Sequence, residues 1–306
     1  MKLIFMGTPD FAVPSLRALA EAGHEIVSVY TQPDRPKGRG YALEPPPVKV
    51  QAQKLGLPVF QPETLRNENV QRQIADTHAD CAVVVAYGKL LPPPVLTAPR
   101  LGCVNVHSSL LPKFRGAAPI QWAILTGERV TGVSTMLLDE GMDTGNILLQ
   151  SETNIDPFET AGQLHDRLAV MGADMIIRTL DGLDHGEITP RKQDESAASY
   201  APMLTKDLCP INWGNSSVNI HNQVRGLQPW PVAETAIEGK RLRIHSTVPV
   251  IDYKGEAGVV MSTSPLIVSC GEGAIEIKEL QIDGGKRMAA ADYLMGHPIA
   301  VGARLG

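Results

Sequence analysis

Cysteine, aromatic residues and long apolar runs are all scarce in this sequence. The 306 residues include four cysteines, and none of them stands in a C-x-x-C spacing, which disfavours a zinc site or a disulfide framework. No apolar run approaches the roughly 20 residues that a membrane-spanning helix needs, and the N-terminus lacks the features of a secretory signal. We therefore expect a cytoplasmic protein that uses no metal and contacts no membrane.

Several nucleotide-binding and hydrolase motifs are absent too. The sequence contains neither a G-x-x-x-x-G-K-[ST] phosphate loop nor a G-x-S-x-G nucleophile elbow. The first turn, Gly7 to Asp10, has one glycine where a dinucleotide-binding turn has three, and it places Pro9 where backbone would approach a pyrophosphate. These absences disfavour P-loop enzymes and serine hydrolases, and they rank a nicotinamide dehydrogenase last.

Charge is modest and slightly negative. The chain has 28 Lys and Arg against 33 Asp and Glu, a net charge of −5, and 43% of its residues are hydrophobic, which is typical of a folded globular protein. The stretch after residue 200 contains ten basic and ten acidic residues. We expect no DNA partner, and any RNA contact there must depend on a local patch of basic side chains, with candidates Arg225, Lys240, Arg241 and Arg243.

Short apolar runs alternate with helical patterns over residues 1–188. Strands are expected at 2–6, 26–30, near Val59, 81–86, 102–106, 131–138 and 146–155. Helices are expected from Pro9 with Thr8 as N-cap, over 48–55 and 69–77, and over 160–180 behind a Thr160–Gln163 capping box. Continuous apolar strands separated by helices predict a doubly wound, Rossmann-like α/β domain with a parallel sheet. The Pro- and Gly-rich segment 31–47 is expected to be an irregular basic loop.

The pattern changes after a polar stretch, residues 189–206, which we interpret as a linker. One short helix at 217–226 is followed by short apolar runs separated by turn residues, at 233–237, 241–246, 258–261, 265–269 and 274–280. This spacing suits a small antiparallel barrel. We therefore expect a second, smaller domain, a small antiparallel β-barrel, over residues 207–306.

Polar residues stand at the end of one buried strand. Asn105 and His107 are two positions apart, so in an extended strand their side chains point the same way. The next predicted strand leads into an acidic loop that contains Asp143, and open α/β sheets bind ligands beyond their strand ends. Amide, imidazole and carboxylate together can stabilise an oxyanion and move a proton. A lone histidine at such a place is more often structural than catalytic, and the neighbouring Asn105 shifts this balance modestly toward catalysis. No serine or cysteine nucleophile is placed comparably, which favours direct transfer to an external nucleophile.

Long ordered motifs then make the sequence recognisable. They are Asn105-Val-His107, Ser109-Leu-Leu-Pro112, Phe114-Arg-Gly-Ala-Ala-Pro-Ile120 and Asp139-Glu-Gly-Met-Asp143-Thr-Gly145, with further matches at Phe5 to Phe11, Asp34 to Gly40 and Ile220 to Pro231. Together they resemble the folate-dependent formyltransferases over nearly the whole chain, most closely the members that act on charged initiator tRNA. The resemblance implies formyl transfer from 10-formyl-tetrahydrofolate, a co-substrate, to methionine carried by initiator tRNA, and we expect a monomer.

The resemblance also implies roles for individual residues. Asn105, His107 and Asp143 match the catalytic triad. The folate-binding positions are Ser109, Leu110, Leu111 and Pro112, with Tyr87, Leu90 and Asp139 lining the pterin pocket. The tRNA-binding positions are Arg35, Lys37 and Arg39 in the 31–47 segment and Lys206 before the second domain. The small barrel over residues 207–306 resembles the family's OB-like β-barrel domain, which the resemblance also assigns to tRNA binding. Taken alone, the Leu-Leu-Pro run would be read as core packing and the basic segment as a solvated loop.

Two other readings stay open. A sugar-nucleotide formyltransferase would share the triad and the barrel, but it would not need the basic residues between Arg35 and Gly40. A non-catalytic tRNA-binding protein could retain the same fold, although the intact triad argues against it.

Overall fold

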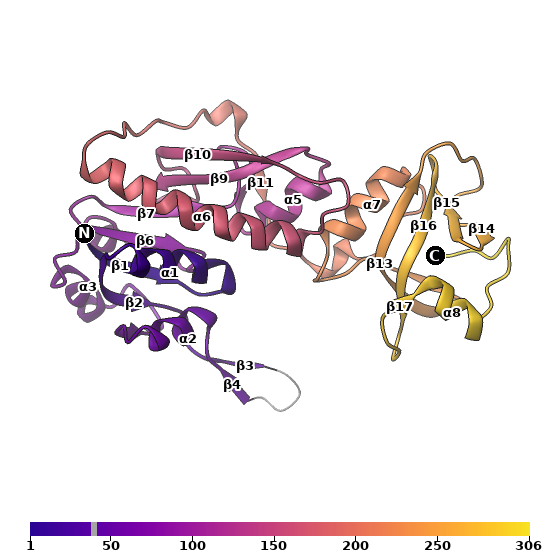
Figure 1. Cartoon of the computed structure of the whole chain (residues 1–306), viewed down its shortest axis with the longest axis horizontal. Coiled ribbons are helices and arrows are strands. Elements are labelled where there is room, and N and C mark those ends of the chain that lie inside the picture. Colours follow the sequence, from indigo (N-terminus) through magenta and orange to yellow (C-terminus); the bar gives the residue numbers. More distant parts are fainter. Residues whose placement is uncertain (38–41) are drawn as a thin grey trace. The chain divides into compact units, whose positions relative to one another are not determined.

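The computed structural model describes residues 1–37 and 42–306, and it divides into two compact units (Figure 1). Unit 1 consists of 1–119, 131–153 and 165–201, and unit 2 of 120–130, 154–164 and 202–306. Each unit is therefore assembled from stretches that are far apart in the sequence. No helix among the described residues is long and apolar enough to cross a membrane.

A seven-stranded sheet forms the centre of unit 1, with the strand order β10-β9-β7-β6-β1-β2-β5. The strands are β1 (Lys2–Gly7), β2 (Glu25–Tyr30), β5 (Val59–Phe60), β6 (Cys81–Val85), β7 (Cys103–His107), β9 (Val130–Leu137) and β10 (Ile147–Asn154). From β7 to β5 every neighbouring pair is parallel. The predicted Rossmann-like parallel sheet is confirmed for these five strands.

Helices cover both faces of this sheet. The helices of unit 1 are α1 (Val13–Glu21), α2 (Pro47–Lys54), α3 (Glu68–Ala75), α4 (Pro93–Leu96) and most of α6 (Ala161–Asp184). Ile4 of β1 and Ala82 of β6 belong to one buried apolar cluster with Ile74 of α3. Gly172 of α6 packs against β7 and β9, so closely that an added Cβ would lie 2.9 Å from Val106 and 3.9 Å from Val133.

One edge of the sheet departs from the predicted parallel arrangement. β9 runs antiparallel to β7, and the register pairs Leu137 with Val104 and Ser134 with His107. The carboxyl end of β9 thus lies three residues, roughly 10 Å, before the carboxyl end of β7. The strand ends alone therefore do not bring Asp143 to His107; the loop after β9 has to turn back along the sheet to do so.

Two local expectations near the N-terminus were also wrong. The segment 31–47 contains an antiparallel hairpin, β3 (Arg35–Lys37) with β4 (Ala42–Glu44). Both strands of a hairpin are edges, so Pro36 is tolerated there. Thr8 does not cap a helix: its hydroxyl donates to Tyr87 O at 3.0 Å, and a short 3-10 helix, Asp10–Ala12, precedes α1.

The predicted capping box of α6 is confirmed. The backbone N–H of Thr160 donates to Gln163 Oε1 at 2.9 Å, and that of Gln163 donates to Thr160 Oγ1 at 3.3 Å. The two bonds satisfy donors at the helix start that have no partner within the helix.

Unit 2 is built on an antiparallel sheet with the order β12-β13-β16-β15-β14, and β17 also pairs with β16. Its strands are β12 (Glu234–Ile237), β13 (Lys240–Val250), β14 (Val260–Thr263), β15 (Leu266–Ser269), β16 (Ala274–Ile282) and β17 (Met288–Ala289), and its helices are most of α5 (Pro119–Leu125), α7 (Ser217–Gly226), α8 (Ala290–Gly296) and the 3-10 turn Lys206–Leu208. The predicted small antiparallel domain is confirmed, with a pairing path that leaves β12 and β14 as edges among the described residues.

A buried histidine joins α7 to this sheet. His221 Nε2 lies 2.9 Å from Pro157 O, so it donates, and Nδ1 accepts from Thr247 Oγ1 at 3.0 Å. Burial lowers the pKa of His221, because desolvation disfavours the charged ring.

The free energy of unfolding should therefore fall on acidification. Below the ordinary histidine pKa of 6.5 the unfolded chain binds a proton at His221 that the folded chain does not take up until lower pH, so stability decreases there. Urea unfolding between pH 7.5 and 5.5 should show this decrease, and His221→Gln should reduce its slope. The exposed His185 gives the control, since His185→Gln should leave the slope unchanged. Equal slopes in all three proteins would contradict this account.

Candidate active site

Two nearly buried polar residues stand on β7, the strand at which the parallel part of the sheet ends. Asn105 is 8% exposed and His107 6% exposed, and they alternate with Val104 and Val106. Because successive side chains of a strand point to opposite faces and α6 packs against Val106, Asn105 and His107 face away from α6. The two predicted triad residues therefore share one side of the sheet.

The third predicted triad residue lies beside them. Asp143 Oδ2 is 3.7 Å from His107 Nδ1, which is ion-pair distance when the ring is protonated. The other ring nitrogen, Nε2, lies 3.0 Å from Phe114 O, and since a carbonyl oxygen only accepts, Nε2 carries a hydrogen. Nδ1 is thus the nitrogen that faces the carboxylate, and it is the one that can gain or lose a proton there.

Backbone groups of one short segment hold both partners. Phe114 O accepts from His107, and the Gly116 N–H donates to Asp143 Oδ2 at 2.8 Å. Arg115 lies between them in β8 (Arg115–Gly116), which pairs with β11 (Tyr200–Ala201). The relative position of His107 and Asp143 therefore depends on this segment.

Asn105 differs from its neighbours in having an unused amide. Within residues 1–37 and 42–306 no group makes a hydrogen bond with its side chain. An amide donor that is nearly buried and not used by the protein is available to an oxygen of a bound molecule.

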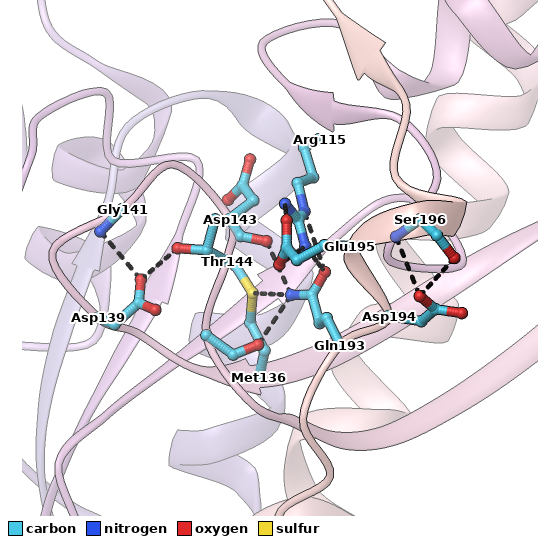
Figure 2. A network of polar contacts seen from close by, with 11 residues as sticks. Arg115, Met136, Asp139, Gly141, Asp143, Thr144, Gln193, Asp194, Glu195 and Ser196 are labelled. Carbon is cyan, nitrogen blue, oxygen red and sulfur yellow. Dashed lines mark hydrogen bonds and ion pairs between the residues drawn. The ribbon is translucent and has the colours of Figure 1, made fainter.

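The loop that carries Asp143 is tightly folded. Asp143 has a φ of +55°, in the left-handed region, and a Cβ added to Gly145 would lie 1.7 Å from Leu137 O. Asp139 Oδ1 accepts from Gly141 N at 3.0 Å and from Thr144 Oγ1 at 2.7 Å. Asp139, a predicted pterin-pocket residue, thus holds its own loop (Figure 2).

Two residues that the sequence reading missed support this loop. Gln193, 4% exposed, donates through Nε2 to Asp143 O at 2.8 Å and to Gly145 O at 2.7 Å. Its Oε1 accepts from Arg115, whose side chain is fully buried (Figure 2). Gln193 stands in a polar stretch without apolar periodicity, and no pattern distinguishes it from its neighbours. Arg115 belongs to the motif Phe114 to Ile120, but nothing in the sequence indicates that its side chain is buried.

The predicted folate segment is partly engaged in internal contacts. Ser109 is fully buried; its hydroxyl donates to Lys113 O and its carbonyl accepts from Ser134 Oγ. Leu111 packs with Met136 and Ile147, as the core-packing alternative anticipated. Leu110 and Pro112 are half-buried, so these two have surface left for a ligand.

A cavity of about 450 Å³ lies at the carboxyl ends of β1, β2 and β6 and beside the β3–β4 hairpin. Its lining includes Thr8, Gln32, Arg35, Pro46 and Tyr87. Burial raises the pKa of Tyr87 to about 12, and its hydroxyl has no hydrogen-bond partner among the described residues. Leu90, by contrast, is 74% exposed, and neither Leu90 nor Asp139 lines this cavity.

The predicted tRNA-binding residues are distributed over both units. Arg35 is exposed on β3 and lines the cavity, and Lys37 ends that strand. Arg39 lies outside the described residues. Lys206 is exposed at the start of its 3-10 turn in unit 2.

Of the basic residues considered for the second domain, one is committed to the interior. Arg225 is 7% exposed and donates to Asp156 O, Glu159 O and Asn222 Oδ1. It is therefore no candidate for a phosphate contact. No group of three or more His, Cys, Asp or Glu in the described part of the chain is arranged to hold a metal ion.

The structure therefore groups an amide, an imidazole and a carboxylate beside one strand of a helix-covered, largely parallel α/β sheet. Comparison with known proteins identifies the class of protein to which this arrangement belongs. The family model described as Formyl transferase matches residues 1–180, and Formyl transferase, C-terminal domain, matches residues 203–298. The chain belongs to the formyl transferase family.

Curated relatives of high sequence identity match both units. The methionyl-tRNA formyltransferase of Geobacter metallireducens is 48% identical over 100% of this chain and 99% of its own length. That of Solibacter usitatus is also 48% identical, with the same coverage. The likeness therefore extends over the entire chain and is not confined to one unit.

Solved structures of lower identity share the fold. The N-formyltransferase from Helicobacter canadensis, in complex with folinic acid and dTDP-3-aminofucose, has a TM-score of 0.69 at 18% identity, covering 94% of this chain and 100% of that one. HypX from Aquifex aeolicus, in complex with tetrahydrofolic acid, has a TM-score of 0.64 at 16% identity, covering 96% of this chain and 47% of that one.

The close backbone approach at Gly145 leads to a stability prediction. Gly145→Ala should lower the free energy of unfolding by about 1–3 kcal/mol, because the new methyl group meets the rigid carbonyl of Leu137. Urea unfolding measures the change. Gly296→Ala is the matched control, since nothing lies within 4 Å of a Cβ there, and it should stay within about 0.5 kcal/mol of the parent. A Gly145→Ala variant as stable as the control would refute the described loop.

Proposed function

We propose that this protein transfers the formyl group of 10-formyl-tetrahydrofolate to the free amino group of methionine on initiator tRNA. The observation that carries this proposal is the likeness, over the full length of both units, to proteins named methionyl-tRNA formyltransferase. The unpartnered amide of Asn105 beside the His107–Asp143 pair supports it, since this set matches what acyl transfer to an amine needs.

In the proposed mechanism the amine attacks the formyl carbon, the bond from that carbon to N10 of the folate breaks, the amine loses a proton and N10 gains one. Asn105 Nδ2 donates a hydrogen bond to the formyl oxygen as negative charge develops on it. A protonated His107, paired with Asp143 through Nδ1, adds positive charge next to that oxygen. The Asp143 carboxylate, the member of this pair that can still accept one, takes up the proton that the amine releases.

The two substrates are proposed to approach from different parts of the chain. Leu110 and Pro112, with surface still free, would contact the folate together with Ser109, Leu111, Tyr87, Leu90 and Asp139. Arg35, Lys37 and Arg39 on the β3–β4 hairpin and its connecting residues, together with Lys206, would contact the tRNA. Residues 1–188 would form the domain that catalyses formyl transfer, and residues 207–306 would form the domain that binds tRNA. Residues 189–206 would connect these two domains.

A transfer assay tests the acceptor. The protein is supplied with 10-formyl-tetrahydrofolate and, in parallel, with methionine-charged initiator tRNA or an amino-sugar nucleotide. We expect formyl-methionyl-tRNA and no formylated sugar. Formylation of the sugar alone would overturn the proposed acceptor while leaving the donor and the triad in place.

The role of Asn105 is tested by substitution. Asn105→Ala should lower the single-turnover rate by roughly a hundredfold or more, because one oxyanion donor is lost. Asn69→Ala, at an exposed position in α3, should leave the rate unchanged. A wild-type rate for Asn105→Ala would remove Asn105 from the mechanism.

The basic hairpin is tested with Arg35→Ala and Arg39→Ala. Each should raise KM for tRNA and reduce the salt dependence of tRNA binding, because phosphate contacts release counterions. Donor binding should not change in Arg39→Ala, whereas Arg35→Ala can also weaken it, because Arg35 lines the cavity that Tyr87 lines. The exposed Arg66 provides the control Arg66→Ala, and equal loss of donor and tRNA binding in Arg39→Ala would show instead that the hairpin is structural.

A further inference from the structure

A glutamine outside the triad makes the contacts that place the Asp143 loop. Gln193 Nε2 lies 2.8 Å from Asp143 O and 2.7 Å from Gly145 O, so both amide hydrogens are used on this one loop. Gln193 is 4% exposed, and at such burial a bond lost to a carbonyl is not readily replaced by solvent. The loop is therefore held through its backbone carbonyls by Gln193, in addition to the bond that Gly116 makes with the Asp143 carboxylate.

The orientation of this glutamine is itself fixed by a buried cation. Arg115 Nε and Nη2 donate to Gln193 Oε1 at 3.0 and 2.8 Å. Arg115 also donates to both carboxylate oxygens of Glu195, at 2.8 and 2.9 Å. Because a guanidinium only donates, it can bind the oxygen of Gln193 and not the nitrogen, and the amide nitrogen must face the loop (Figure 2).

The loop needs such support because the sheet does not supply it. β9 ends opposite Val104 and not opposite His107, so the chain must return toward His107 before β10 begins. At the point of contact Asp143 is in the left-handed region, with a φ of +55°. Residues other than glycine rarely adopt this backbone conformation, and they keep it only where surrounding contacts hold the backbone in place.

We propose that Gln193 is a positioning residue for the triad: held by Arg115, its amide grips the carbonyls of Asp143 and Gly145 and keeps the Asp143 carboxylate opposite His107. The catalytic consequence rests on the proposed function. The backbone on either side of Arg115 touches the same pair, through Phe114 O and Gly116 N. One short segment and one glutamine thus determine the geometry of both ionisable residues.

Two variants distinguish the contribution of the amide nitrogen of Gln193, which binds the loop, from that of its oxygen, which binds Arg115. Gln193→Glu keeps an acceptor for Arg115 but replaces the donor to the loop, and Gln193→Met removes both without adding charge. Each should lower the single-turnover rate at least about tenfold, the scale seen when a supporting residue misplaces a reacting group. Donor binding, measured by equilibrium titration, should stay within about twofold, since neither variant touches the predicted folate segment.

The matched control is Gln71, whose Nε2 also donates to a backbone carbonyl, Leu65 O at 2.9 Å, in the same unit. Gln71→Glu should leave the rate unchanged. Urea unfolding of all variants shows whether they are folded under assay conditions. A wild-type rate in both Gln193 variants would overturn the proposal.

A double-mutant cycle shows whether Gln193 acts through Asp143. In the Asp143→Asn background, Gln193→Met should cause little further loss of rate, because the group that it positions is already gone. Independent, multiplicative losses would mean a general structural role and would refute the proposal.

A last measurement needs no acceptor. The ¹⁵N spectrum of histidine-labelled protein contains signals from eight histidines, and His107→Asn assigns those of His107. Gln193→Met and Asp143→Asn should move the ¹⁵N chemical shifts of the His107 ring nitrogens in the same direction, because both variants change what faces Nδ1, whereas Gln71→Glu should not. Unchanged His107 shifts in Gln193→Met would refute the positioning role. If the signals shift but no methionyl-tRNA is formylated, the proposed function fails and the positioning role stands.

Discussion

The geometry of the site depends on the hydrogen bonds that the buried side chain of Arg115 makes with Gln193 and Glu195. Its guanidinium is fully buried, and a charge removed from water is tolerated only when its donors are satisfied. Gln193 and Glu195 satisfy them. The hydrogen bond from Arg115 lowers the pKa of the Glu195 carboxyl, so that the acceptor stays ionised beside the cation. Since Glu195 is largely exposed, the buried amide of Gln193 is the partner that solvent cannot replace.

Arg115 influences the site through a chain of contacts. The guanidinium determines which end of the Gln193 amide faces the loop, and the amide nitrogen then fixes two carbonyls around Asp143. The strand that carries Arg115 pairs with Tyr200–Ala201, and the N–H of Phe114 donates to Ser199 Oγ at 2.9 Å. The polar segment after α6 thus packs into the same unit as the triad. A loop that the sheet topology leaves unsupported is held by chain that arrives much later in the sequence.

Much of the sheet and part of the site could be predicted because they follow local rules. Continuous apolar runs mark β1, β6 and β7, and the two-residue spacing of Asn105 and His107 puts them on one face. An apolar run does not indicate the direction in which its strand pairs with its neighbours, and the antiparallel pairing of β9 was missed for that reason. Gln193 was missed because a buried polar cluster has no periodicity. Its partners are 78 and 50 residues away in sequence, so only the tertiary fold reveals them.

The polar groups around the triad differ in what remains available to a substrate. Ser109, Asp139 and Gln193 use their side chains on protein partners. Asn105 has no such partner within the described residues, although it is nearly buried. Leaving a buried donor unpaired costs about 1–3 kcal/mol, and a folded chain tolerates that cost where a ligand supplies the missing acceptor. A donor held in a poorly hydrated position needs little reorganisation when charge develops on a nearby oxygen, and it interacts with that charge more strongly than water would. In the proposed mechanism, the rigid support of Asp143 and the unpaired amide of Asn105 are complementary: the first would fix the proton acceptor, and the second would fix where the negative charge is stabilised.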